Sequence, residues 1–124
     1  MWVMSSVWFE SVREQLEAAI SLPHGWDTYQ GVPSSLTSVE RAFSFLGAYL
    51  QNKSLPPTVV PLSDGGIQLV WHQNGVDVEA TFPVGDDGEV YVRDIADGTE
   101  TEFSLASRGV GPAALREAFQ RLTA

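Results

Sequence analysis

The spacing of hydrophobic residues changes from a helical period to a two-residue period at Pro56 and Pro57. Before these prolines, apolar residues recur every three or four positions, as they do on one face of an α-helix. After them, short segments alternate between apolar and polar residues, as in strands that bury one face. Residues 76–82 show this most clearly, because Val, Val, Ala and Phe alternate with Asp, Glu and Thr. The chain is therefore expected to combine helices with an antiparallel sheet.

The pattern predicts three helices and four or five strands. The helices are expected at residues 5–21, 36–51 and 112–122, with Ser5 or Ser6 and then Ser35 as candidate N-caps. The strands are expected at residues 58–62, 67–72, 76–82 and 89–93, with 99–105 as a candidate fifth. We therefore expect an α+β fold in the order α-α-β-β-β-β-(β)-α. Helices would pack on one face of the sheet, and the other face would meet water.

Length and composition suit one domain spanning residues 1–124, because 44% of the 124 residues are hydrophobic and only 19% are charged. The absence of cysteine rules out disulfides and thiolate chemistry, and it fits a reducing cytosol. Glu10 and Arg13 interrupt the apolar N-terminus early, so we expect no signal peptide. No apolar run reaches the roughly 18 residues that a membrane span needs. We therefore expect a cytoplasmic protein.

Acidic residues dominate the charged set, with sixteen against seven basic residues and a formal net charge of -9. This balance argues against direct binding of nucleic acid, which uses clustered Lys and Arg, and against binding to anionic membranes. Ten of the acidic residues lie between Asp64 and Glu102, where Arg93 is the only basic residue. The remaining residues carry six charges of each sign. The sequence therefore assigns the whole net charge to the predicted sheet.

Strand alternation places several of these acidic residues on the solvent side of the sheet. A face rich in carboxylates attracts basic partners and accelerates their association. The same face has a second interpretation as an ordinary solvated surface, because acidity by itself favours solubility. The candidate partner-binding residues are Asp77, Glu79, Glu89, Tyr91, Glu100 and Glu102.

The loop at residues 22–34 is the candidate site for chemistry, because it holds His24, Trp26, Asp27 and Tyr29. A His–Asp pair can act as a general base or bind a metal. However, no nucleophile motif, zinc motif or phosphate-binding loop accompanies the pair. A loop histidine beside an Asx-type turn is the competing interpretation. We expect no catalytic residue, no metal and no cofactor.

The same loop also has a structural interpretation. Asp27 is expected to accept backbone N–H bonds from Tyr29 or Gln30, and Trp26 is expected to plug the space between the first two helices and the sheet. The other residues assigned to structure are Gly65 and Gly66, in a turn with positive φ, and Trp71, on the buried side of a strand.

The stretch from Leu22 to Phe82 resembles a family of small, uncharacterised bacterial and phage-borne proteins. The resemblance rests on a Gly-Trp-Asp loop at 25–27, a Glu-Arg-Ala segment at 40–42 and an Asp-Gly-Gly-Ile-x-Leu-x-Trp motif at 64–71. It covers about half of the chain, and Gln30 departs from the glycine that is usual in that family. The resemblance implies a small bacterial or phage accessory protein and implies no activity.

Three hypotheses follow for function. The first is a non-enzymatic protein that docks and inhibits a basic partner, such as a toxin or nuclease, as antitoxins, immunity proteins and DNA-mimicking inhibitors do. The second is a small enzyme or ligand-binding protein built on the His24 loop. The third is an assembly component that associates through exposed apolar residues such as Trp2 and Val3.

Overall fold

The computed structural model describes residues 8–27, 31–51, 53–105 and 111–123, and these form three helices and one five-stranded sheet. The helices are α1 (Phe9–Ile20), α2 (Leu36–Tyr49) and α3 (Gly111–Arg121). The strands are β1 (Thr58–Pro61), β2 (Ile67–Gln73), β3 (Val76–Phe82), β4 (Glu89–Asp94) and β5 (Glu100–Ser104). This order confirms the predicted α+β fold and includes the candidate fifth strand.

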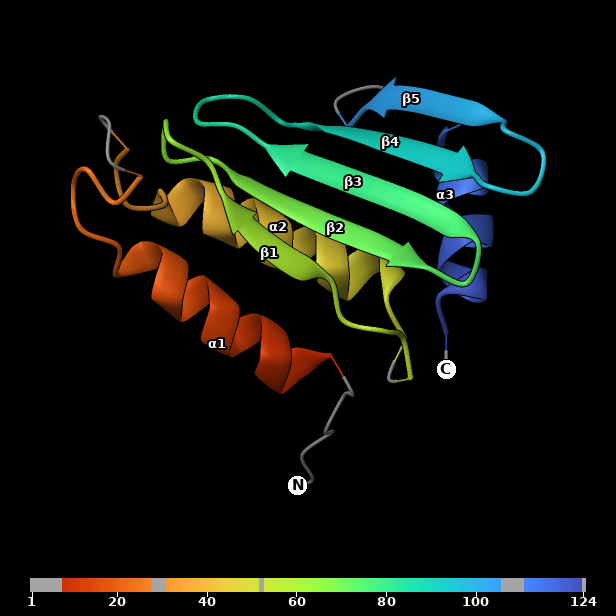
Figure 1. Ribbon diagram of the computed structural model, residues 1–124, viewed down its shortest axis with the longest axis horizontal. Coiled ribbons are helices and arrows are strands. Elements are labelled where there is room, and N and C mark those ends of the chain that lie inside the picture. The colour runs from red at the N-terminus through yellow and green to blue at the C-terminus, as the bar shows by residue number, and fades with distance from the viewer. Residues whose placement is uncertain (1–7, 28–30, 52, 106–110, 124) are drawn as a thin grey trace.

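The sheet is an antiparallel meander in which every strand pairs with its neighbours along the chain, in the order β1-β2-β3-β4-β5 (Figure 1). Short turns make this possible. Between β2 and β3, Asn74 and Gly75 have φ values of 54° and 77°, which suit the tight turn of a two-residue hairpin. β1 and β5 are therefore the two edges of the sheet.

The three helices cover one face of the sheet. α1 contacts β1, α2 contacts β2 and β3, and α3 contacts β3, β4 and β5. In Figure 1, α2 passes behind β1 and β2, and α3 passes behind the β4–β5 end. The strand residues that point toward the helices are buried, among them all four apolar residues of β3. No described helix covers the opposite face, which we call the outer face.

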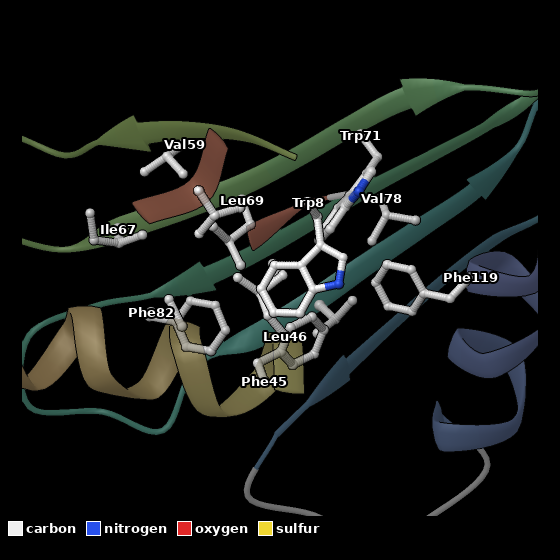
Figure 2. Packing of buried hydrophobic residues seen from close by; sticks show 14 of the residues in the cluster. Trp8, Phe45, Leu46, Val59, Ile67, Leu69, Trp71, Val78, Phe82 and Phe119 are labelled. Atoms are coloured by element: carbon white, nitrogen blue, oxygen red, sulfur yellow. The ribbon is translucent and has the colours of Figure 1, made fainter. Parts of the chain in front are cut away.

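Aromatic side chains join the helical layer to the sheet. Phe45 of α2 contacts Phe82 of β3 with ring centroids 5.6 Å apart, and it contacts Phe119 of α3 at 6.0 Å. Trp71 of β2 meets Phe119 edge-on at 4.9 Å, and its indole N–H donates to the Leu55 carbonyl at 2.9 Å. Figure 2 shows these side chains in the cluster. Trp71 is thus a core residue, as predicted.

The start of α1 differs from the prediction. The helix begins at Phe9, and its N-cap is Trp8, whose side chain makes no capping hydrogen bond. Trp8 is only 7% exposed, and its indole N–H donates to the Gln51 carbonyl at 3.0 Å, so it ties α1 to the segment that follows α2. The candidate caps Ser5 and Ser6 lie outside the described residues. The predicted cap of α2 is confirmed, because the Ser35 side chain accepts the Ser38 N–H at 3.3 Å.

Candidate protein-binding face

The strand register places all six candidate partner-binding residues on the outer face. In one row across the sheet, Glu79 of β3 lies opposite Tyr91 of β4, which lies opposite Glu102 of β5. In the next row, Asp77, Arg93 and Glu100 face one another in the same way. Glu89 belongs to a third row, between Thr81 and Ser104. The alternation of these strands was therefore sufficient to place the six side chains.

The charge of the outer face is smaller than the sequence indicated. Of the ten acidic residues between 64 and 102, five lie on this face beside Arg93, which gives a net charge of −4 with neutral histidine. β4 extends to Asp94, which lies on the same side as Val92 and forms an ion pair with Arg121 of α3 at 2.7 Å. The other four acidic residues lie between strands, at Asp64, Asp86, Asp87 and Asp97. The expectation that the sheet carries the entire net charge was wrong, because turns and the helix-covered face hold half of these carboxylates.

One end of the outer face is internally paired. Asp77 Oδ1 lies within hydrogen-bonding distance of the His72 ring, 2.7 Å from Nδ1. The Tyr91 hydroxyl donates to Glu100 Oε1 at 2.6 Å. This hydrogen bond is the main reason that the pKa of the Tyr91 phenol is raised, followed by desolvation and the negative charge of Glu100. Two of the five carboxylates therefore already have a partner within the protein.

The other end of the outer face gathers the remaining three carboxylates. Glu79, Glu89 and Glu102 border a hollow of about 320 Å³, whose other lining residues are Gln68, Thr81 and Tyr91. No ion pair joins any of the three to a basic side chain within the described residues. Carboxylates in this arrangement can receive the cationic head of a Lys or Arg side chain while its stem lies against the tyrosine ring. Gln68, Thr81 and His72 were not among the predicted residues, although the alternation of their strands places them on the outer face.

The Gly-Trp-Asp loop and the Asp-Gly-Gly turn meet in space. Asp27 Oδ1 accepts the Gly31 N–H at 2.9 Å, and Asp27 Oδ2 accepts the Ser63 hydroxyl at 2.5 Å. The Ser63 carbonyl in turn accepts the Val32 N–H at 3.0 Å. Asp27 thus holds its own loop closed and connects it to the turn before β2. Asp27 was predicted to accept backbone N–H bonds from Tyr29 or Gln30. It accepts one from Gly31, and Tyr29 and Gln30 lie outside the described residues.

Trp26 does not enter the core as predicted. Its side chain is half-buried and stays with its own loop, because the indole N–H donates to the Val32 carbonyl at 2.8 Å. In the adjacent turn, Gly65 has a φ of +95°, and the Gly66 N–H donates to Asp64 Oδ1 at 2.9 Å. The Trp26 indole therefore bonds within its own loop.

His24 is exposed, whereas both carboxylate oxygens of Asp27 accept hydrogen bonds from Gly31 and Ser63. Within the described residues, no group of three or more His, Asp or Glu side chains is arranged to hold a metal ion. No helix in that part of the chain combines the length and apolar character needed to cross a membrane. Trp2 and Val3, the candidate assembly residues, lie outside the described residues.

Comparison with protein-family models, with curated proteins and with solved structures found no match to this chain.

Proposed function

We propose that this chain is a non-enzymatic binding protein whose outer face docks a basic protein in the cytosol and inhibits it. The observation that carries the proposal is the group formed by Glu79, Glu89 and Glu102. These three carboxylates surround one hollow and have no basic counterpart within the described residues. In the strand register Glu89 is diagonal to both Glu79 and Glu102, within reach of long side chains, so these like charges repel one another in the free protein. A cationic partner would relieve that repulsion.

The distribution of charge supports a directional approach of the partner. The outer face has a net charge of −4, and the two carboxylates that hydrogen-bond within the protein, Asp77 to His72 and Glu100 to Tyr91, lie to one side of the hollow. A field of one sign raises association rates by roughly 10- to 1,000-fold for partners of the opposite sign. Individual exposed ion pairs contribute only about 0.2–1 kcal/mol each. The affinity therefore depends on side chains that enter the hollow and lose water there.

Inhibition follows if the partner uses its basic surface to bind nucleic acid. Nucleases and nucleic-acid-binding toxins hold phosphates with clustered Lys and Arg side chains. A protein that covers those side chains with carboxylates occupies the same surface and excludes the nucleic acid. The proposed partner class is therefore a toxin, nuclease or other nucleic-acid-binding protein, and the likeness to antitoxins, immunity proteins and DNA-mimicking inhibitors is one of charge and size.

The test compares two triple variants that change the net charge equally. The face variant replaces Glu79, Glu89 and Glu102 by Gln, and the control replaces the exposed Glu14, Glu40 and Glu117 on the helices by Gln. Each immobilised protein is exposed to host extract, and the retained protein is identified, purified and titrated by calorimetry. We expect wild type and control to bind one basic protein and block its activity, and the face variant to bind it at least about tenfold more weakly.

The proposal fails if the face variant binds that partner as tightly as the control does. It also fails if the bound partner keeps its full activity. Raising the salt concentration is expected to weaken binding of wild type and control, because screening shortens the reach of exposed charges to about 8 Å at physiological ionic strength.

A further inference from the structure

The two edges of the sheet differ in whether their outward backbone groups have partners. At the β1 edge, the Val59 N–H donates to Oε1 of Gln15 in α1 at 2.8 Å, and Gln15 Nε2 donates to the Pro57 carbonyl at 3.2 Å. Pro61, which ends β1, has no N–H to offer. The first helix and a proline therefore close this edge against another strand.

Among the described residues, none pairs with the β5 edge at Glu100 and Glu102. Antiparallel neighbours alternate between residues that bond across the pair and residues whose N–H and C=O groups point away from it. The bonds from Asp94 N–H to the Thr99 carbonyl and from Leu105 N–H to the Gly88 carbonyl, both 2.9 Å, flank the pairing of β5 with β4. The odd-numbered residues of β5 therefore bond to β4. The backbone groups of Glu100 and Glu102 point outward, and none of the described residues bonds to them.

We propose that the basic partner supplies an extended segment that pairs antiparallel with the outer edge of β5, with Lys or Arg at alternate positions. This inference rests on the proposed function and names how the partner docks. A residue directly opposite Glu100 or Glu102 shares the outer face with it, because paired residues in a sheet point to the same side. Basic side chains at those positions meet the two carboxylates, and the Glu102 position leads to the hollow beside Glu79.

The intervening residues of the partner segment point to the helix-covered side. There they lie beside Thr101 and Phe103, and Phe103 is partly buried against the core. An apolar or β-branched residue fits that side. The expected partner segment thus alternates basic and apolar residues.

A second copy of this chain is a poor occupant of the same edge. Antiparallel pairing of two β5 strands about Thr101 would place Glu100 of one copy opposite Glu102 of the other, on the same face. Like charges directly opposite each other destabilise a strand pair, and charged edge strands are known to resist self-association. The charge that disfavours a second copy favours a basic strand.

The probe is a fluorescent heptapeptide that alternates Lys and Val, added to the full chain at low salt. In the proposed pairing the Lys amides face β5 and the Val amides face away. We expect N-methylation of the Lys amides to weaken binding about tenfold or more and N-methylation of the Val amides to leave it unchanged. A Glu-Val heptapeptide is expected not to bind. Anisotropy gives the affinities, and hydrogen exchange followed by NMR is expected to slow at the Glu100 and Glu102 amides.

A variant pair separates the backbone from the charge. Glu102→Pro removes an outward N–H without touching the bonds to β4, and Glu102→Gln keeps the N–H while removing the charge. We expect Glu102→Pro to bind the Lys-Val peptide about tenfold more weakly than Glu102→Gln does. If Glu102→Pro does not fold, the exchange measurement on wild type decides.

Three results would overturn the edge proposal: no binding of the Lys-Val peptide, equal binding of the two methylated peptides, or unchanged exchange at both amides when peptide is saturating. If protection of these amides rises with protein concentration in the absence of peptide, the edge binds a second copy of the chain, and the edge proposal is overturned as well. These results would leave the proposed function to its own test. A partner that lies flat on the outer face would bind the face variant more weakly than the control variant, but it would not slow hydrogen exchange at the Glu100 and Glu102 amides.

Discussion

Gly31 is the residue that allows the Gly-Trp-Asp loop to close. A Cβ at this position would lie 2.7 Å from the Asp27 carboxyl carbon and 2.9 Å from the Trp26 indole nitrogen. Asp27 accepts the Gly31 N–H and the Trp26 indole donates to the Val32 carbonyl, so moving either side chain would break a hydrogen bond. We expect Gly31→Ala to lower the free energy of unfolding by about 1–3 kcal/mol, measured by urea denaturation.

Gly47 provides the matched control for that substitution. It lies in the exposed part of α2, and a Cβ there would meet nothing within 4 Å. Gly47→Ala is expected to raise the free energy of unfolding by about 0.5–1 kcal/mol, because alanine loses less backbone entropy in a helix. Equal effects of the two substitutions would show that the close approach at Gly31 is not what holds the loop.

Tyr91 reports the electrostatics of the outer face. Its pKa is raised first by the hydrogen bond to Glu100, then by desolvation and by nearby carboxylates. Since the folded-state pKa lies above the unfolded value, the interaction stabilises the fold at pH values below the ordinary tyrosine pKa and is lost as the pH rises through the folded pKa. We expect Glu100→Ala to lower the Tyr91 pKa toward 10.0. NMR titration of the ring measures it, with Glu89→Ala as control. Equal shifts in both variants would contradict the role of the hydrogen bond.

At the scale of elements, Arg121 joins the end of α3 to the end of β4 and to the turn between β2 and β3. Its guanidinium bonds to Asp94 Oδ2 at 2.7 Å and to the Gly75 carbonyl at 3.1 Å. The Asn74 side chain returns a bond to the Arg121 carbonyl at 2.7 Å. We expect Arg121→Met to lower the free energy of unfolding by about 1–2 kcal/mol. The expected loss is kept small because the Arg121 and Asp94 side chains are about one-third exposed, and solvent screens their charges. Arg116→Met, at an exposed α3 position without an ion pair to any described residue, is expected to change it little. If Arg116→Met lowers the free energy of unfolding by the same amount, the loss comes from a change in α3 itself rather than from the contacts of Arg121 with Asp94 and Gly75.

Local patterns in the sequence predicted the elements well, and long-range contacts explain what they missed. Alternation located β3 at 76–82 and placed the six outer-face residues, because side-chain direction in a strand depends only on position. The predicted end of β4 was one residue short, because the strand continues to Asp94, which alternation places on the side of Val92. The bond from Gln15 to β1 spans more than forty positions along the chain, and no local pattern contains it. Trp26 was misplaced because aromatic content indicates packing but does not say against what.

The molecule as a whole separates charge between its two layers. Outside residues 64–102 the acidic and basic residues are equal in number, whereas the outer face of the sheet carries a net charge of −4. The core does not require acidic residues on the outer face, because the buried residues of the strands all point to the helical side. Like charges on that face therefore cost stability without helping the core to form.

That cost gives a prediction in which stability and binding move in opposite directions. Replacing Glu79, Glu89 and Glu102 by Gln removes mutual repulsion, so we expect the free energy of unfolding at low salt to rise by about 0.5 kcal/mol, and the gain to shrink as salt is added. The helix-side control at Glu14, Glu40 and Glu117 lacks a shared hollow and is expected to change it less. Urea denaturation at two salt concentrations measures both. If the face variant is more stable and yet binds the basic partner as tightly as the control, the outer face is a solvated surface and nothing more. If it is more stable and binds more weakly, the same three carboxylates strain the free protein and hold its partner.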